Sequence, residues 1–242
     1  MSVELNDFPR VMSLAVHELR TPVTVVSGYL RMLLRDQAGP LNDKQRKMVE
    51  EAERSCSRIG ALVTEMSELG KLESEMLTLS GPEFDLSALL TEVASSMHDG
   101  DDRGITLETR GTDRPVMVAG DRPRLAAVLR ALMHAAIRER PDAGVIVVEC
   151  STFTQSDQPW VTVAVGAEPG LRALADAGRT DHASFDEWRG GLGLALPVGR
   201  RVVEAHGGAL WSAPGDTPRA GSAIRLPIGS RARQGPPYAT KG

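Results

Sequence analysis

A seven-residue apolar repeat near the N-terminus constrains the fold of this chain more than any other feature. Two apolar rows share this spacing, one with Met12, Leu19, Val26 and Leu33 and the other with Val16, Val23 and Leu30. Side chains repeated in this way share one face of an α-helix and form the seam of a coiled coil or helical bundle. The sequence therefore predicts one long helix from about Asp7 to Arg35, with an apolar face that another helix covers.

A second helix is predicted after a turn at residues 37–41 (Gln-Ala-Gly-Pro-Leu). It starts at Asn42, a suitable N-cap, and runs to about Met76. Its apolar positions also have near-heptad spacing: Met48, Ala52, Ile59, Leu62, Met66, Leu69 and Leu72. A single helical hairpin exposes too much of such a seam, so we expect two hairpins to form a four-helix bundle in a homodimer. The alternative is that the seam packs against the rest of the same chain.

The pattern changes after a linker at residues 79–82 (Leu-Ser-Gly-Pro). Helices are predicted at Leu86–Met97, Arg122–Glu139 and Gly193–His206, and strands at Ile105–Thr109, Val116–Ala119, Val145–Ser151, Trp160–Val165, Ala209–Ser212 and Ser222–Leu226. This order indicates an α/β sandwich with helices on one face of a mixed sheet. We therefore expect an α+β protein with a dimerisation hairpin at residues 1–80, an α/β sandwich at 81–229 and a disordered tail at 230–242.

Composition narrows the classes of function. The chain of 242 residues is long enough for two small domains, and its net charge of −4 gives no basic face for nucleic acid. No stretch approaches the roughly 18 consecutive apolar residues of a membrane helix, and the N-terminus lacks the features of a signal peptide. Cys56 and Cys150 are too few and too isolated for a disulfide framework or a metal site, which predicts reduced thiols in a cytoplasmic protein without direct membrane insertion.

The segment His17–Pro22 (His-Glu-Leu-Arg-Thr-Pro) places three reactive groups within about one helical turn. A ring nitrogen of His17 is suited to accept a phosphoryl group, and Glu18 is placed to hold the proton on the other nitrogen. Thr21 lies four residues further, where its hydroxyl would orient a water molecule. We predict that these three residues are catalytic. A lone histidine on a helix is usually an ordinary surface residue, so the prediction rests on the whole string, including Pro22, which predicts a local kink.

This string resembles the phosphoacceptor box of sensor histidine kinases. Residues 190–196 (Gly-Gly-Leu-Gly-Leu-Ala-Leu) and 204–208 (Glu-Ala-His-Gly-Gly) resemble the second glycine box and following helix of the ATP-binding domain of the same family, which has the Bergerat fold. The resemblance implies a histidine phosphoacceptor hairpin followed by an ATP-binding-like domain. It also implies these nucleotide-binding residues: Arg138, Gly170, Gly191, Leu192, Gly193 and Leu194.

Two positions of the implied nucleotide site depart from the family pattern. Ala135 stands where the family has the asparagine that binds magnesium, and Ala167 where it has the aspartate that binds the adenine amino group. A methyl group offers Mg²⁺ no oxygen ligand, and the loss of a buried polar partner costs about 1–3 kcal/mol. Glu168 is a candidate displaced carboxylate, although a shift of one residue at a strand end directs it elsewhere. ATP and Mg²⁺ are therefore the implied cofactors of an impaired site, with a short lid at Leu171–Arg189.

Three functions are compatible with these residues. The first is an autokinase that phosphorylates His17 from ATP and passes the phosphoryl group to a response-regulator aspartate. The second is a histidine phosphotransferase or response-regulator phosphatase with a pseudo-ATPase domain, which needs only His17, Glu18 and Thr21. The third is a dimeric scaffold that binds a receiver domain without catalysis. Only sixteen residues precede His17, so we expect the signal to come from an upstream sensor protein, or the chain to be an excised core.

Overall fold

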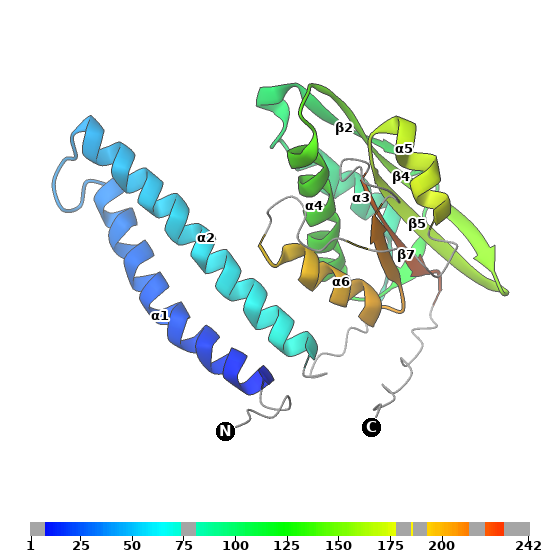
Figure 1. The fold of residues 1–242 in the computed structure, drawn as a ribbon, viewed down its shortest axis with the longest axis horizontal. Coiled ribbons are helices and arrows are strands. Elements are labelled where there is room, and N and C mark those ends of the chain that lie inside the picture. The colour runs from blue at the N-terminus through cyan, green and yellow to red at the C-terminus, as the bar shows by residue number, and fades with distance from the viewer. Residues whose placement is uncertain (1–7, 74–80, 178–184, 186–192, 213–220, 230–242) are drawn as a thin grey trace. The chain divides into compact units, whose positions relative to one another are not determined.

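The computed structural model describes residues 8–73, 81–177, 185, 193–212 and 221–229. Contacts between Cα atoms divide the chain into two units, Met1–Leu77 and Thr78–Gly242. The first unit is a helical hairpin and the second is an α/β unit (Figure 1).

The hairpin consists of α1 (Phe8–Leu34) and α2 (Asp43–Glu73), which confirms both predicted helices. Its core is formed by Val16, Cys56 and Val63, each less than 7% exposed. The Cys56 thiol donates to the backbone carbonyl of Val23 at 3.5 Å, so the two helices are closely packed at this level. Gly70 of α2 lies opposite Met12 of α1, where a Cβ would be 3.4 Å from Cγ of Met12, an ordinary contact distance.

Side chains at the loop hold the two helix ends in place. The guanidinium of Arg46 donates to the carbonyl of Leu34 at 3.1 Å and pairs with the carboxylate of Asp36 at 2.8 Å. Asn42 is the predicted cap of α2: its side-chain oxygen accepts from the Gln45 N–H at 2.9 Å, and the Gln45 side chain accepts from the Asn42 N–H at 3.0 Å. This reciprocal pair is a capping box, which satisfies amide groups that a helix start leaves without partners.

The two predicted apolar rows of α1 separate in the structure. Val16 is buried and Val23 and Leu30 are half-buried, in line with their place in the contact with α2. Leu19 and Val26, from the middle of the other row, are 43% and 49% exposed. The middle of the second row therefore remains on the surface, whereas its two ends, Met12 and Leu33, are half-buried.

The α/β unit is built on a mixed sheet of five strands in the order β2-β4-β5-β7-β6. Its strands are β2 (Ile105–Arg110), β4 (Gly144–Gln155), β5 (Gln158–Gly166), β6 (Ala209–Ser212) and β7 (Ser222–Pro227). The β2–β4 pair is parallel and the other pairs are antiparallel. The mixed sheet confirms the predicted fold class. A smaller sheet pairs β1 (Glu83–Asp85) with β3 (Met117–Ala119).

Three helices pack together on one side of the large sheet: α3 (Leu86–Ser95), α4 (Arg122–Glu139) and α6 (Ala195–Ala205). A short 3-10 helix, η2 (Asp101–Arg103), precedes β2. The main core lies between these helices and the alternate strand residues that include Ile146, Val148 and Val163, each less than 3% exposed. Arg103 donates to the carbonyl of Ile137 at 3.0 Å, which satisfies a group at the C-terminal end of α4.

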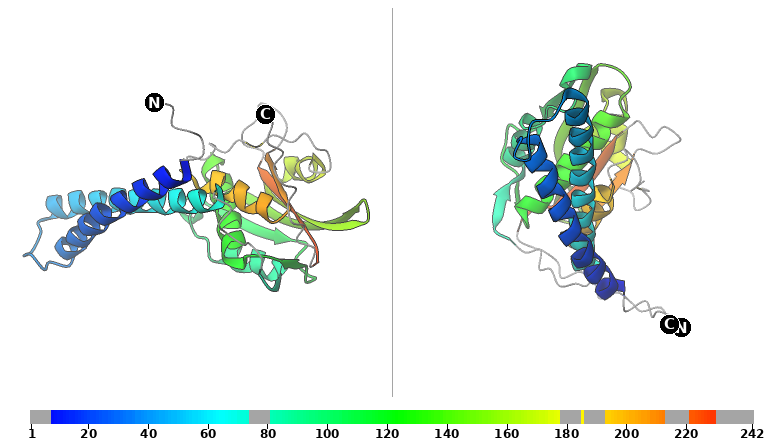
Figure 2. Two further views of the ribbon diagram at one scale, coloured as in Figure 1. Left: turned by 90° about the horizontal axis from the view of Figure 1, so that it is seen from below. Right: turned by 90° about the vertical axis from the view of Figure 1, so that its left-hand side faces the viewer.

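A fourth helix, α5 (Glu168–Ala177), was not predicted and occupies the first part of the expected lid, whose remainder lies outside the described residues except for Phe185. Its Leu171 and Leu174 are buried in a cluster with strand residues that alternate with those of the main core: Val147, Ala164, Trp211 and Ala223. Because alternate strand residues point to opposite faces, α5 covers the other face of the sheet, and Figure 2 shows it apart from α4 and α6. Within the described residues, no helix combines the length and apolar character needed to cross a membrane.

Candidate functional site

His17 projects from the middle of α1 into solvent. Its side chain is 80% exposed and that of Glu18 is 74% exposed, with 3.7 Å between His17 Nδ1 and the Glu18 carboxylate. The apolar rows of α1 leave this position outside the hairpin core, as the periodicity predicts. The ring is therefore open to an approaching partner, and its Nδ1 edge faces a negative charge.

Thr21 is also exposed on α1, one turn after His17. Pro22 lies within the helix and has no N–H to give to the Glu18 carbonyl four residues earlier. Two residues later, the Thr24 hydroxyl donates to the Arg20 carbonyl at 2.8 Å. The structure therefore brings the three predicted catalytic side chains onto one short, solvent-facing stretch of α1.

The α/β unit has a cavity of about 180 Å³ where the C-terminal end of α4 meets strand ends of the sheet. Its walls include Ala136 from α4, Ile146 from β4, Gly166 from β5 and Gly221 before β7. Ala167, the residue at the expected adenine position, also lines the cavity. Its methyl group has no atom that accepts a hydrogen bond.

The charged residues that line this cavity are Glu139 and Arg140, which sequence reasoning did not single out. The Arg140 guanidinium donates through Nε to the carbonyl of Asp142 at 3.1 Å. Both residues lie at the C-terminal end of α4, the helix that also carries Ala135 and Arg138, which the resemblance linked to the nucleotide site. Their closeness in sequence to Ala135 and Arg138 is the signal that could have identified them.

The residues around Ala135 do not fit a magnesium ion. Ala135 is fully buried and Ala131 is 8% exposed, so both methyl groups belong to the core of the unit. Mg²⁺ requires oxygen ligands in near-octahedral geometry, which these side chains cannot supply. Among the described residues, no group of three or more His, Cys, Asp or Glu side chains is arranged to hold a metal ion.

Glu168 does not replace the missing carboxylate at position 167. Its Oε1 pairs with Nη1 of Arg110 at 2.7 Å, and the Arg110 Nε contacts Glu108 at 2.7 Å. The two carboxylates hold the pKa of the Arg110 side chain above its ordinary value, so the guanidinium stays charged. Glu168 therefore serves as an anchor between the first turn of α5 and the edge strand β2.

The remaining described residues predicted to bind nucleotide lie on α4, on α5 and directly before α6. Arg138 is exposed in the last turn of α4, and Gly170 lies in α5. Gly193 has a φ of +66°, which suits glycine, and Leu194 precedes α6. Gly191 and Leu192 lie outside the described residues. None of the four described positions lines the cavity around Ala167.

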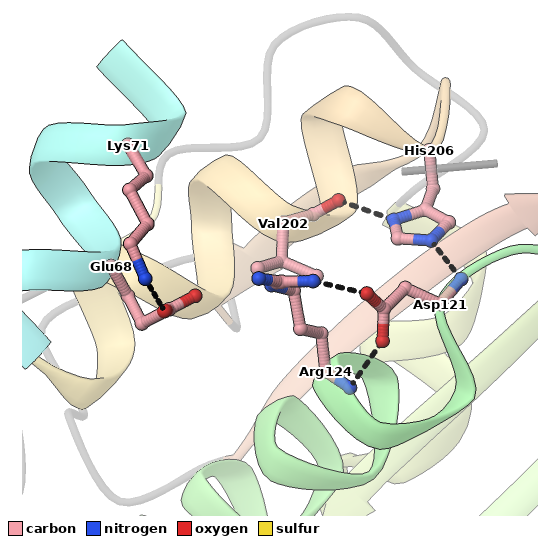
Figure 3. Close-up of polar contacts among 6 residues, drawn as sticks. All are labelled: Glu68, Lys71, Asp121, Arg124, Val202 and His206. Carbon is pink, nitrogen blue, oxygen red and sulfur yellow. Dashed lines mark hydrogen bonds and ion pairs between the residues drawn. The ribbon is translucent and has the colours of Figure 1, made fainter. Parts of the chain in front are cut away.

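His206 and Asp121 form a polar contact that the sequence did not predict (Figure 3). The His206 Nε2 accepts from the Asp121 N–H at 2.9 Å, and Nδ1 lies 2.7 Å from the carbonyl of Val202. Burial lowers the pKa of His206 from its ordinary value. The Asp121 carboxylate also pairs with the guanidinium of Arg124. The other ion pair drawn in Figure 3, Glu68–Lys71 at 3.1 Å, belongs to α2 of the hairpin.

Residues 10–75 match the family model of the His Kinase A (phospho-acceptor) domain. The chain is 30% identical over 200 residues to the signal transduction histidine-protein kinase BarA of Escherichia coli K12, a match that covers 79% of this chain and 22% of BarA. It is 31% identical over 214 residues to the sensor protein SphS of Synechococcus elongatus, covering 83% of this chain and 50% of SphS. The chain thus spans half or less of these relatives.

Solved structures of histidine kinases share the fold. Full-length ShkA, crystallised in complex with AMPPNP, superimposes with a TM-score of 0.66 at 23% identity, covering 91% of this chain and 46% of ShkA. The histidine kinase AdeS of Acinetobacter baumannii gives a TM-score of 0.52 at 23% identity, covering 89% of this chain and 98% of that chain. The hairpin is therefore a His Kinase A phospho-acceptor domain, and the chain as a whole has the core architecture of the sensor histidine kinases.

Proposed function

We propose that this protein carries a phosphoryl group on His17 and exchanges it with an aspartate of a response-regulator receiver domain. The observation that carries the proposal is the His17 ring, 80% exposed on α1 with the Glu18 carboxylate 3.7 Å from its Nδ1. A proton on Nδ1 is favoured by that carboxylate, and the lone pair is then on Nε2. The nucleophilic nitrogen is then Nε2, on a ring that is open to a partner.

The transfer itself balances without a further reactant. The Nε2 lone pair attacks the phosphorus of the receiver's aspartyl phosphate, an N–P bond forms and the P–O bond breaks. The receiver regains a free carboxylate, and the imidazolium charge that develops is stabilised by Glu18. The reverse transfer uses the same groups. Thr21, exposed on the same stretch of α1, would orient water for hydrolysis of the aspartyl phosphate in the phosphatase direction.

We infer that ATP-driven phosphorylation of His17 is slow or absent. The support for this inference is the buried methyl group of Ala135, the Ala167 methyl in the cavity wall and the Glu168 carboxylate engaged by Arg110. Without a metal ion, the negative charge that develops in phosphoryl transfer from ATP has no cation to neutralise it. Exchange with a receiver aspartate does not depend on these positions.

A homodimer is the second part of the proposal. The hairpin exposes large apolar side chains on both helices: Val11, Leu14, Leu19, Val25, Val26, Tyr29, Met32, Met48 and Ile59. A monomer rarely leaves so many apolar side chains in water on one element. A second hairpin with the same surface would cover them in a four-helix bundle.

Two labelling reactions test the proposal. The full chain is incubated with γ-labelled ATP and Mg²⁺ in one, and in the other with a receiver domain that labelled acetyl phosphate has phosphorylated. We expect label from the receiver and little from ATP. Strong acid-labile labelling from ATP would overturn the inference about ATP and identify an autokinase. No label and no accelerated loss of receiver phosphate would indicate a scaffold and contradict the proposal.

A further inference from the structure

The ring of His206 is held in one tautomer at the C-terminal end of α6. It is 7% exposed, with Nδ1 2.7 Å from the Val202 carbonyl and Nε2 2.9 Å from the Asp121 backbone nitrogen. A carbonyl only accepts a hydrogen bond and a backbone N–H only donates one. The proton must therefore be on Nδ1, and Nε2 must be the acceptor (Figure 3).

This hydrogen bond joins the C-terminal end of α6 to Asp121, the residue directly before α4. Asp121 is the N-cap of α4: its Oδ1 accepts from the Arg124 N–H at 3.0 Å while its own N–H is given to His206. The backbone comes very close to the ring here, since a Cβ on Gly120 would lie 2.3 Å from Cδ2 of His206. The ring therefore fixes the end of α6 directly to the backbone of the α4 cap.

The backbone of Gly120 also contacts Gly81, near the start of the α/β unit. A Cβ on Gly81 would lie 2.2 Å from the carbonyl oxygen of Gly120. Gly120, with a φ of +154°, thus lies between Gly81 and the ring of His206. The contact between His206 and Asp121 therefore lies one residue away from Gly81, near the start of this unit.

We propose that His206 is an acid-sensitive latch, which fastens α6 to the N-terminus of α4 while Nε2 is unprotonated and releases it when Nε2 gains a proton from solvent. The protonated ring has an N–H at both nitrogens, so the Nε2 N–H then faces the Asp121 N–H. Two donors at hydrogen-bond distance repel each other, and each loses its partner in a buried site.

Burial sets the direction in which the pKa of His206 shifts, and the groups around the ring modify that shift. Burial, the largest effect, lowers the pKa of His206. The hydrogen bond to the Val202 carbonyl and the Asp121 carboxylate oppose this shift, and the Arg124 guanidinium adds to it. The other charged groups of the neighbouring elements have contacts of their own. On α6, Glu204 pairs with Arg200 and Arg201; on β7, Arg225 lies over Trp160; on β1, Asp85 accepts from the Ser87 N–H, and Glu83 is exposed.

The sign of the effect follows from linkage. The native ring has a lower pKa than the released ring, whose ordinary value is about 6.5. The released form therefore binds more protons, and acid favours it. The latch is closed near neutral pH, and its opening increases by up to about tenfold for each pH unit between about 6.5 and the lower pKa of the native ring.

The test is native-state hydrogen exchange of the α6 amides in the full chain, from pH 8 to pH 5, corrected for the intrinsic exchange rate. The matched variant is His206→Gln, whose side-chain oxygen accepts from the Asp121 N–H and does not titrate. We expect α6 to open more readily below about pH 6.5 in the wild type and to show no such change in the variant. A control variant with His98→Gln and His134→Gln, which removes two histidines on other elements, should behave like the wild type.

Spectra of the ¹⁵N-labelled imidazole ring provide a second readout that needs no substitution at His206. We expect the Nδ1–H tautomer at neutral pH and its conversion to imidazolium over the range in which α6 exchange accelerates. The proposal is overturned if the ring is the Nε2–H tautomer, if α6 exchange stays constant down to pH 5, or if the same acceleration occurs in His206→Gln or equally in β4 and β5.

Discussion

Glu168 and Arg110 form an ion pair at 2.7 Å that connects the first turn of α5 to the edge strand β2. This contact occupies the carboxylate nearest in sequence to Ala167. The cavity beside Ala167 is therefore left with a methyl group at the position where the family resemblance places an acid. The pair accounts for why Glu168, only one residue away, does not line the cavity beside Ala167.

The first prediction concerns that position. Ala167→Asp would place a carboxylate in the cavity wall, and we expect the affinity for an ATP analogue to rise about tenfold, because one buried hydrogen bond to a charged group contributes about 1.5 kcal/mol. Isothermal titration calorimetry measures the change. Glu168→Ala is the control and should leave the affinity unchanged. Equal affinities of Ala167→Asp and the wild type would show that the cavity is not the adenine site.

A charge on the exposed apolar surface of α1 should disrupt the dimer. Val26 is 49% exposed, and Val26→Glu would bury a charge in the proposed bundle without entering the hairpin core. Burial of an unpaired charge is costly, so we expect monomers at concentrations where the wild type is dimeric. Sedimentation velocity distinguishes the two states. Lys47→Glu, at an exposed polar position of α2, should remain dimeric, and a monomeric wild type would refute the prediction.

The indole of Trp211 stabilises the end of α5. Its Nε1–H donates to the carbonyl of Leu174 at 2.7 Å, and both residues are buried. Trp211→Phe keeps an aromatic ring but leaves this carbonyl without its donor, at an expected loss of about 1–3 kcal/mol in the free energy of unfolding. Urea unfolding followed by circular dichroism measures the loss. Trp160→Phe, which keeps a ring beneath Arg225, should cost less; an equal cost would argue against the hydrogen bond.

The N-cap of α4, Asp121, should make the free energy of unfolding depend on pH in the acid range. Burial alone would raise the pKa of Asp121, but hydrogen bonds from the Arg124 N–H and guanidinium outweigh it and hold the pKa below its ordinary value. A folded pKa below the unfolded one means that this contribution is complete above the unfolded pKa of about 3.9 and is lost as the pH falls through the lower folded value.

Asp121→Ala should therefore lower the free energy of unfolding by about 1 kcal/mol at pH 7, as expected for the loss of an N-cap. The difference from the wild type should shrink below about pH 3.9. Urea titrations at several pH values measure it. Asp113→Ala, at an exposed position, serves as the control. A difference that stays constant with pH would mean that the carboxylate charge does not stabilise the cap.

Local patterns in the sequence were sufficient to predict much of the fold. The heptad rows predicted α1 and α2, and Asn42 was correctly predicted as the cap of α2 because capping depends on residues three positions apart. The helix Arg122–Glu139 was predicted with its observed ends, and in the structure Asp121 is its N-cap and Pro123 lies in its first turn. These signals are short in range, so no tertiary contact is needed to read them.

Other features depend on contacts between distant residues. Leu171 and Leu174 have helical spacing, but that spacing does not reveal their burial against Trp211, which stabilises α5 in place of an open lid. The Arg110–Glu168 pair joins residues 58 positions apart, and the contact of His206 with Asp121 spans 85 positions. Periodicity and motifs carry no information on such pairs. The predicted catalytic residues were placed together because all three are on one helix.

The most direct test of the central claim is to locate the phosphoryl group. The full chain is incubated with a receiver phosphorylated by labelled acetyl phosphate, and the label is mapped by acid and alkali stability and by peptide analysis. We predict an acid-labile, alkali-stable label on His17, which is absent from His17→Gln and retained in His98→Gln, a variant at another exposed histidine. Label that persists in His17→Gln, or that lies on another residue, would contradict the account.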